Sequence, residues 1–380
     1  MKRPGKVKRF YDYSLLAAII FLCVFGLIIV YSSSSYSAEL KLGDPLYYFK
    51  RQGVILAASF VGMILVSKID YHWYSKLTPL AWIMAVVMML LTNFTPLGIE
   101  LNGQKRWLGV TETLSFQPAE FVKIAIILTM ALWISKIGRK IDTLRGLVVA
   151  AILGFIPFFL VAMNNLSSGI IIAGICFVVC FVGSKNKGIY LFGSALVLAL
   201  AFVFVQFGEN MVEAGILESY QLERIRVWQN PEAYPQTGGW QVLQGLYAIG
   251  SGGLFGRGLG QSIQKLGFIP EAMNDMVFSI ICEELGLFGA LCVILLFLFM
   301  IWRFMIIANN APDLLGALIV VGVMAHIAIQ VILNVAVVTN TIPNTGISLP
   351  FISYGGTSLM FLMAEMGMVL GVSNRITLEQ

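Results

Sequence analysis

The chain has 380 residues, of which 58% are hydrophobic and only 12% are charged, with a formal net charge of +5 at pH 7. Its mean hydropathy is +0.85. A soluble domain averages about 45–50% apolar and about 25% charged residues, so the composition excludes an ordinary soluble globular protein and indicates an integral membrane protein. The five cysteines and two histidines lack the spacing of a disulfide framework or a metal site, and no feature predicts an organic cofactor or a nucleic-acid partner.

Ten apolar segments are candidates for membrane spans. A spanning helix needs about 20 mostly apolar residues, and shorter segments are tolerated in a bundle through tilt and local bilayer thinning. The sequence therefore predicts an all-α integral membrane protein of about ten transmembrane helices. It would form a single domain over residues 1–380, with a large loop over residues 208–274 between helices seven and eight. The ten segments cover residues 13–31, 53–67, 77–95, 119–135, 146–163, 169–184, 188–207, 275–302, 314–338 and 355–372.

The distribution of positive charge predicts the orientation. The N-terminal stretch MKRPGKVKR has five Lys or Arg residues and no acid, and the loops KIDYHWYSK, KIGRKIDTLR and GSKNKG fall on the same side. Short cytoplasmic loops carry an excess of Lys and Arg, so we predict that both termini are cytoplasmic and that the 208–274 loop is extracytoplasmic. The first segment resembles a secretory signal, but nine further spans indicate an uncleaved anchor.

The stretch from NGQKRWLG to FQPAEFVKIA places charges at and inside the fourth span. Glu120 and Lys123 are three residues apart and therefore share one helix face. Charge within a span is usually functional and paired, although these two residues could simply neutralise each other. Arg106, beside Trp107, is either an interfacial anchor or a cation that binds phosphate.

The 208–274 loop contains two amphipathic stretches and a glycine-rich run. In YQLERIRVWQ and GWQVLQGLYAI the apolar residues recur at helical spacing, which predicts short helices at the membrane surface. Arginine offers bidentate phosphate contacts, and glycine-rich backbone such as GSGGLFGRGLGQS can hold an anion. The loop is therefore predicted to bind an anionic group such as a diphosphate. Its cations are Arg224, Arg226, Arg257 and Lys265.

Four acids lie in the stretch PEAMNDMVFSIICEELG at the start of the eighth span. The proline and the Asn-Asp pair predict a capped helix start, and for Glu271 a solvated position at that start is an open alternative. Asp275 would lie at the membrane interface facing the outer loop, and it is the candidate for chemistry. Glu283 and Glu284 lie about 80° and about 180° around the helix axis from Asp275, so they cannot pair with it. We interpret them as buried structural or gating acids.

The segment TIPNTGISLPFISYGGTS breaks the chain beside the last span with prolines and glycines. Irregular backbone at membrane depth is tolerated only where it lines a cavity or is buried in protein. The segment also carries Ser353, Tyr354, Thr357 and Ser358. It is therefore predicted to line a cavity rather than to act as a plain loop, and Ser353 is a candidate substrate contact.

Together these stretches resemble the SEDS family of bacterial envelope proteins, which includes FtsW, RodA and SpoVE. The resemblance covers nearly the whole chain. FQPAEFVK is similar to the family's QPSEFAK, and LPFISYGGTS is similar to its LPFxSYGGSS. The stretch from AIGSGGLFGRGLG to EELG is similar to its glycine-rich, Pro-Glu, Asp and Glu-Glu-x-Gly run. The glycine run looks more like FtsW or SpoVE than RodA.

The resemblance implies a bacterial plasma-membrane enzyme that polymerises lipid II into peptidoglycan strands beside a class B penicillin-binding protein. A role in cell division or cell shape follows from the same family. Asp275 matches the family's catalytic aspartate, and Glu120 with Lys123 matches its buried ion pair. The outer-loop residues implied to handle substrate are Arg224, Gln241, Gln244, Lys265 and Glu271.

The chain departs from the family pattern at three places. Met273-Asn274 stands where a His-Thr pair is usual, Ser167 stands where an acid is expected, and Gly245 replaces a frequent serine. The aspartate itself is present, so the implied chemistry is kept. The missing acid leaves the role of Ser167, metal binding included, undefined at this point.

The predicted reaction is an inverting glycosyl transfer, because a β-1,4 linkage is made from an α-linked lipid diphosphate. Asp275 would be the base, and Lys123, Arg106, Arg224 and Lys265 are candidates to stabilise the phosphates. A divalent cation, Mg²⁺ or Mn²⁺, is a further expectation, because hard oxygen ligands and diphosphate suit it. Two alternatives are a transporter of a lipid-linked precursor, which broken helices and intramembrane charges also fit, and a non-catalytic scaffold for a transpeptidase.

Overall fold

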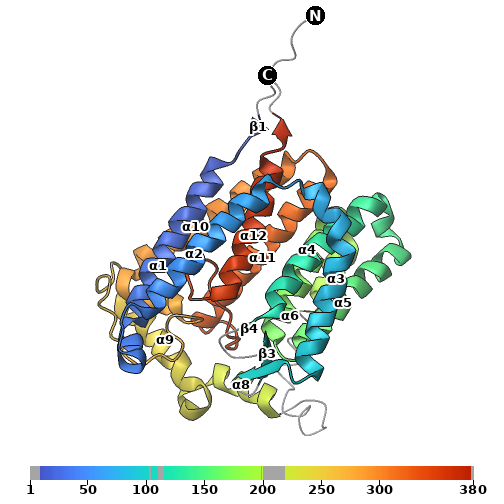
Figure 1. The fold of residues 1–380 in the computed structure, drawn as a ribbon. Coiled ribbons are helices and arrows are strands. Elements are labelled where there is room, and N and C mark those ends of the chain that lie inside the picture. The colour runs from blue at the N-terminus through green and yellow to red at the C-terminus, as the bar shows by residue number, and fades with distance from the viewer. Residues whose placement is uncertain (1–8, 102–103, 110–114, 198, 200–218, 378–380) are drawn as a thin grey trace, which may run out of the picture.

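The structure is a computed structural model that describes residues 9–101, 104–109, 115–197, 199 and 219–377. It is a bundle of long helices with both termini at one end and helices α8 and α9 at the other (Figure 1). Nine helices in the described residues are long and apolar enough to cross a membrane. They are α1 (Tyr13–Leu42), α2 (Tyr47–Lys68), α3 (Tyr71–Phe94), α4 (Pro118–Ile137), α5 (Leu144–Ala162), α6 (Leu166–Gly183), α10 (Val277–Asn309), α11 (Leu314–Val338) and α12 (Gly356–Ser373).

The prediction of an all-helical membrane bundle is confirmed, and the predicted spans correspond to these helices. The predicted span 188–207 begins in a shorter apolar helix, Lys187–Val197. Residue 198, residues 200–207 and the loop up to 218 lie outside the described residues. Beyond them, the two amphipathic stretches of the outer loop form α8 (Ser219–Gln229) and α9 (Gly239–Gly252), as predicted. Between these two helices lie short 3-10 helices, Pro231–Ala233 and Pro235–Thr237.

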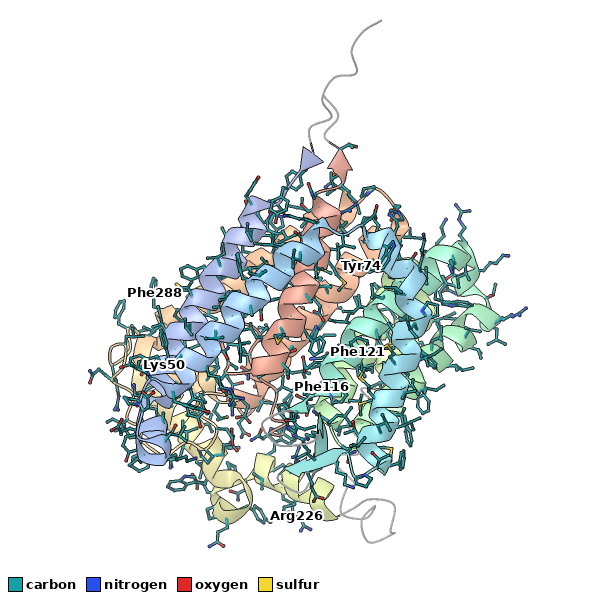
Figure 2. The ribbon with its side chains drawn as sticks, viewed as in Figure 1. Lys50, Tyr74, Phe116, Phe121, Arg226 and Phe288 are labelled. Atoms are coloured by element: carbon teal, nitrogen blue, oxygen red, sulfur yellow. The ribbon has the colours of Figure 1, made fainter. Side chains whose placement is uncertain are left out.

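Three helices form the centre of the bundle. In the most apolar 18-residue window, 67% of residues are buried in α11 and in α12 and 56% in α4, against 17% in α2 and 22% in α3. The peripheral helices present large apolar side chains outward, such as Phe288, which is 64% exposed and points away from the bundle in Figure 2. Apolar surface of this extent is stable only against lipid or another protein. The pattern is that of a bundle whose outside faces the membrane.

Side-chain caps begin several of the helices. The first amides of a helix lack intrahelical partners, and Asp, Asn or Thr oxygens accept from them. Asp12 caps α1, Thr143 caps α5, Asn165 caps α6 and Asp313 caps α11. Pro118 occupies the first turn of α4, where its missing N–H costs nothing. Polar residues at the ends of apolar runs thus set where the spans begin.

Two small sheets were not predicted. At one end of the bundle, β1 (Arg9–Phe10) pairs antiparallel with β5 (Ile376–Thr377), which holds the two ends of the described chain together. At the other end, the connection between α3 and α4 forms a three-stranded antiparallel sheet in the order β2-β3-β4. Its strands are Gly98–Leu101, Gln104–Gly109 and Ser115–Phe116. Both termini therefore lie at the end opposite to this sheet and to α8 and α9 (Figure 1).

Helix α10 is interrupted at Gly286, whose φ of 68° and ψ of −169° are not helical. The glycine-rich run after α9 fits into this break so closely that a Cβ on Gly256 would lie 2.2 Å from the backbone oxygen of Glu284 in α10. The run was predicted to hold an anion. It instead supplies backbone partners to the broken helix, and glycine is required for that approach. Four hydrogen bonds of 2.9–3.0 Å join the segments: Arg257 N to Glu283 O, Gly258 N to Glu284 O, Leu287 N to Gly253 O and Phe288 N to Leu254 O.

Candidate active site

A cavity of about 260 Å³ lies at the end of the bundle that carries α8 and α9. Its walls come from β3, from α8 and α9, and from the segment after α11. Asp275, two residues before α10, also lines it. It brings together four of the predicted site residues, Arg106, Arg224, Gln241 and Asp275. Among the described residues, the lining consists of Arg106, Glu223, Arg224, Val227, Trp228, Gly238, Gln241, Val242, Asp275, Asn344, Thr345 and Gly346.

The carboxyl group of Asp275 is buried but only loosely hydrogen-bonded. The Gln241 side-chain amide lies 3.3 and 3.5 Å from its two oxygens. Burial, and next the nearby charge of Glu271, raise the pKa of Asp275 to about 7. A carboxyl group with a pKa near neutrality can both accept and release a proton under physiological conditions, which is the property a general base needs. The burial and raised pKa of Asp275 suit the role of base, which stays a prediction.

Asp275 does not cap the helix that follows it. The sequence predicted a helix start at Asn274–Asp275, but α10 begins at Val277, with Met276 at the capping position and no side-chain cap. The residues from 270 to 276 form turns instead. The carboxyl group is consequently not held by the amides of the first helical turn, and it faces the cavity. The Asp275 side chain therefore lines the cavity rather than capping α10.

Two guanidinium groups line the same cavity. Arg106, on β3, donates from Nε to the carbonyl of Asn164 at 3.0 Å and also donates to the side chain of Gln104. Arg224, on α8, donates to the carbonyl of Asn344 at 3.3 Å. These contacts help to orient each arginine toward the cavity. The planar donor set of arginine matches phosphate oxygens, so the cavity combines a carboxyl base with two groups suited to an anionic leaving group.

Glu120 and Lys123 form a buried ion pair on α4 but do not line the cavity. Lys123 Nζ lies 2.8 Å from Glu120 Oε1, and the side chains are 2% and 8% exposed respectively. Ser358, near the start of α12, donates to the other carboxylate oxygen of Glu120 at 3.2 Å. The prediction that the two charges share one helix face and pair is confirmed. Their partners join α4 to α12 and so support the centre of the bundle.

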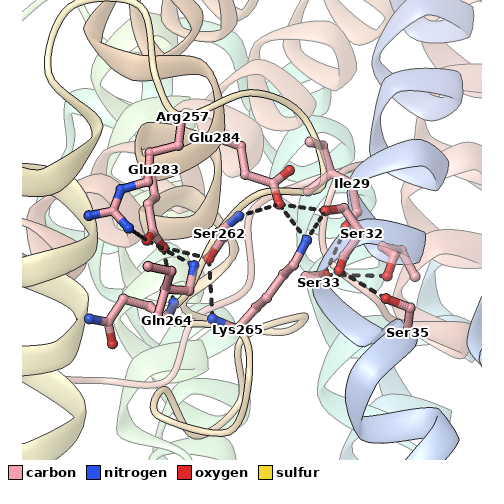
Figure 3. Close-up of polar contacts among 12 residues, drawn as sticks. Ile29, Ser32, Ser33, Ser35, Arg257, Ser262, Gln264, Lys265, Glu283 and Glu284 are labelled. Carbon is pink, nitrogen blue, oxygen red and sulfur yellow. Dashed lines mark hydrogen bonds and ion pairs between the residues drawn. The ribbon is translucent and has the colours of Figure 1, made fainter.

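Lys265 is held in a second polar cluster, away from Asp275. Its ammonium group donates to Glu284 at 2.7 Å and to the hydroxyl of Ser32 at 2.8 Å, as Figure 3 shows. Ser32, on α1, also donates to Glu284 at 2.6 Å. The contacts satisfy the charge of Lys265 within the protein. The structure thus places this predicted phosphate ligand in a buried cluster that ties α1 to α10.

Glu283 anchors the loop that precedes Lys265. Its carboxylate accepts from the amide of Ile263 at 3.0 Å and from that of Gln264 at 3.3 Å, and it also accepts from the Ser262 hydroxyl (Figure 3). A guanidinium nitrogen of Arg257 lies 3.6 Å from Oε1 of Glu283. Glu283 and Glu284 are fully buried, so both need these partners. The interpretation of the two acids as structural agrees with these contacts, although most of their partners lie in the loop rather than in neighbouring helices.

The remaining predicted site residues also lie outside the main cavity. Glu271 has a positive φ of 55°, accepts from the Asn274 side chain and lines a second cavity of about 290 Å³ beside the end of α1. Gln244 is buried on α9. Ser353 donates to the carbonyl of Asn274 at 2.6 Å. The structure therefore separates the predicted set into a cavity group and a supporting group.

A family model described as "Cell cycle protein", FTSW_RODA_SPOVE, matches residues 13–377. The chain belongs to the FtsW/RodA/SpoVE family. It is 36% identical over 364 residues to "Stage V sporulation protein E" of Bacillus subtilis (strain 168), covering 95% of this chain and 96% of that protein. It is 34% identical to "Probable peptidoglycan glycosyltransferase FtsW" of Trichlorobacter lovleyi, covering 98% of this chain and 95% of that protein. The resemblance noted in the sequence is confirmed.

Solved structures show the same FtsW/RodA/SpoVE architecture. A chain in "Structural coordination of polymerization and crosslinking by a peptidoglycan synthase complex" superposes with a TM-score of 0.77 at 26% identity, over 96% of this chain and 97% of that one. RodA of Thermus thermophilus superposes with a TM-score of 0.70 at 24% identity, over 97% of this chain and 98% of that one. The second likeness supports the fold alone.

Several cavity residues of this FtsW/RodA/SpoVE member were not singled out from the sequence. Glu223 and Trp228 lie on α8 among residues that read as an ordinary amphipathic helix, so no signal distinguished them. Asn344 belongs to the segment TIPNTGISLPFISYGGTS, which was predicted to line a cavity. The polar residues predicted there, such as Ser353, lie closer to its C-terminal end. Ser167, where the family resemblance led us to expect an acid, donates to the carbonyl of Thr345 at 2.6 Å and so holds this cavity wall.

The described residues of the cavity offer few ligands for a metal ion. Its carboxylates are Asp275 and Glu223. In the part of the chain that the structure describes, no group of three or more His, Cys, Asp or Glu side chains is placed to hold a metal ion. A divalent cation, which usually takes six or more oxygen ligands, would need most of them from phosphate and water. The expected Mg²⁺ or Mn²⁺ stays a prediction.

Proposed function

We propose that this protein is a peptidoglycan glycosyltransferase that polymerises lipid II at the outer face of the bacterial plasma membrane. The observation that carries the proposal is the single cavity that holds Asp275, whose pKa is raised to about 7, together with Arg106 and Arg224. Membership of the FtsW/RodA/SpoVE family, with relatives described as probable peptidoglycan glycosyltransferases, gives the substrate class. A buried base beside cations suits attack by a hydroxyl group on a sugar diphosphate.

The reaction is a single displacement at the anomeric carbon of the donor. Asp275 takes the proton of the acceptor's 4-hydroxyl as the new C1–O4 bond forms, and the bond between C1 and the phosphate oxygen breaks. The electron pair leaves with undecaprenyl diphosphate, whose growing charge faces Arg106 and Arg224. Attack from the face opposite the leaving group converts the α-linked donor to a β-1,4 linkage. Asp275 later releases its proton to water, which its pKa near neutrality permits.

The proposed location places both termini in the cytoplasm and the cavity at the outer surface. The two termini share one end of the bundle, and the cavity lies at the opposite end (Figure 1). The basic N-terminal stretch supports the cytoplasmic assignment of the termini. The protein acts beside a class B penicillin-binding protein that crosslinks the new strands. A structural neighbour described as part of a peptidoglycan synthase complex supports this pairing.

The test is a lipid II polymerisation assay with purified protein, with and without the penicillin-binding protein. Asp275→Ala should lose glycan product while keeping the wild-type melting profile and partner binding. Asp44→Ala is the matched control, because Asp44 is an exposed carboxylate between α1 and α2 at the same end of the bundle. It should polymerise like the wild type. Undiminished glycan product from Asp275→Ala would end the assignment.

The same preparation tests the two alternatives. In proteoliposomes, movement of lipid II between leaflets without any polymer would identify a transporter. Full support of the penicillin-binding protein's crosslinking by Asp275→Ala, given preformed glycan strands, would identify a scaffold. The glycosyltransferase proposal expects polymer from the wild-type protein and neither of these results alone.

A further inference from the structure

Helix α11 carries a buried polar stripe along its length. His326, Gln330 and Asn334 are spaced four residues apart and therefore lie on one face. Their exposed fractions are 1%, 3% and 0%. Polar side chains inside a membrane span are costly unless they are bonded within the protein. The partners of this stripe therefore show what it is for.

The stripe bonds to the irregular segment between α11 and α12. Gln330 donates to the carbonyl of Ser348 at 3.0 Å, and His326 lies 2.9 Å from the Gln330 side-chain oxygen. Asn334 donates to the carbonyl of Ile347 at 2.7 Å and also to the carbonyl of Asp275 at 2.8 Å. Asn334 thus differs from its neighbour one turn away, because it also reaches the segment that carries the proposed base.

The backbone of that segment is held at three consecutive carbonyl groups. The Met273 carbonyl accepts from the amide of Tyr354 at 2.8 Å, and the Asn274 carbonyl accepts from the Ser353 hydroxyl at 2.6 Å. The Asp275 carbonyl accepts from Asn334, the third anchor. Since Asp275 precedes the first residue of α10, these contacts set its position instead of a helical turn.

We propose that Asn334 is a positioning residue for glycosyl transfer: by holding the Asp275 carbonyl and the Ile347 carbonyl at once, it aims the Asp275 carboxyl into the cavity. The inference rests on the function proposed above. A side-chain amide offers two N–H donors from one nitrogen, which matches two carbonyl acceptors. Its oxygen has no partner among the described residues, so the donors are what this site uses. The nitrogen assignment follows from the two facing carbonyls.

The decisive comparison is Asn334→Ala against Gln330→Ala. Both residues lie buried on one face of α11, and both donate to a carbonyl of the segment after α11, but only Asn334 bonds Asp275. Asn334→Ala should lower kcat by about a hundredfold, the cost of roughly 1 Å of misplacement, with KM changed by less than about twofold. Gln330→Ala should lower thermal stability by a similar amount but keep kcat within about threefold of wild type.

Hydrogen exchange supplies a readout that does not depend on activity. Amides of residues 271–276 should exchange faster in Asn334→Ala than in Gln330→Ala. If Asn334→Ala does not fold, Asn334→Ser, which keeps one donor, takes its place in the same comparison. Equal kcat loss in both variants, or unchanged exchange over 271–276, would overturn the inference. A wild-type protein that makes no glycan would instead overturn the proposed function.

Discussion

Two regions near the start of α10 hold carboxylates in different ways. Glu284, fully buried, accepts from Lys265 at 2.7 Å and from Ser32 at 2.6 Å. Asp275, nine residues earlier, is also buried, but its nearest side-chain donor is the amide of Gln241 at 3.3 Å. One acid is held through one oxygen by short, charge-assisted contacts, whereas the other has only longer side-chain contacts and faces a cavity.

The difference is the one expected between an acid that supports the fold and an acid proposed to act as a base. A carboxylate bonded to an ammonium group joins chain segments through a charge-assisted hydrogen bond, as Glu284 does with Lys265. Asp275 lacks such a partner. Its burial and the charge of Glu271 outweigh its hydrogen bonds to Gln241 and to nearby backbone amides, which raises the pKa of Asp275 to about 7. Among the predicted phosphate ligands, Lys265 pairs with Glu284, while Arg106 and Arg224 line the cavity.

The most severe test of the contrast is Asp275→Asn. Loss of a general base lowers rates by about 10²–10⁴-fold, so polymerisation should fall to background. Stability should move the other way. Because the pKa of Asp275 rises from 3.8 to about 7 on folding, the folded state binds a proton that the unfolded state has released, and wild-type stability declines as pH rises through this window.

The asparagine variant escapes that decline and should melt at a higher temperature than the wild type at about pH 8, with little difference at about pH 4. Three pKa units correspond to at most about 4 kcal/mol, and water in the cavity reduces the gain. Thermal unfolding in detergent at the two pH values measures it. A variant that melts below the wild type at the higher pH would contradict the idea that Asp275 is a strained, reactive acid.

Lys265→Met should produce the next largest effect, and on stability rather than chemistry. It removes the ammonium partner of the buried Glu284, and an uncompensated buried charge costs about 3–5 kcal/mol. The double variant Lys265→Met, Glu284→Gln should recover most of that loss. The control is Lys41→Met. Lys41 is exposed and, like Lys265, lines the second cavity of about 290 Å³, so this variant should melt like the wild type. The KM of the folded Lys265→Met variant for lipid II should equal that of the wild type. A large increase in KM would show that Lys265 binds the substrate.

The pH dependence of the wild-type rate should show the raised pKa of Asp275 directly. The base acts only when ionised, so kcat/KM should fall about tenfold for each pH unit below about 7. Glu271→Gln removes a negative charge that raises the pKa of Asp275, so the acid limb should move to lower pH. Initial rates from about pH 5 to about pH 9 test both statements. An acid limb that stays in place in Glu271→Gln would show that Glu271 does not act on Asp275.

Much of the fold follows from local sequence patterns. The spans follow from apolar runs, and their starts follow from capping residues such as Asp12 and Asp313. The helices α8 and α9 follow from helical periodicity. The break in α10 does not, because Gly286 reads as one glycine in a long helix, and its meaning depends on backbone from residues 253–258 packing into it. That contact joins segments distant along the chain, which periodicity does not register.

For the candidate site, the sequence predicted individual charged residues but not their contacts. Asp275, Arg106 and Arg224 could be named because charge at a membrane boundary is costly and therefore informative. The sequence could not show which charges already have a partner inside the protein. Lys265, for example, bonds to Ser32, which lies more than 200 residues away along the chain. Asn334 escaped notice for the opposite reason: a neutral amide in an apolar helix gives little signal until its two carbonyl partners are seen.

The smallest expected effect concerns Ser167, which stands where related sequences led us to expect an acid. Its hydroxyl donates to the Thr345 carbonyl in the cavity wall at 2.6 Å, so Ser167→Ala should cost about 0.5–1.5 kcal/mol of stability and change the polymerisation rate little. Ser167→Asp should cost more, because a carboxylate oxygen would face that carbonyl oxygen without a donor between them. Melting temperatures of the two variants decide the matter. If the aspartate variant were the more stable, a cation or proton would have to join the two oxygens, and the cavity wall would then be a ligand site rather than a support.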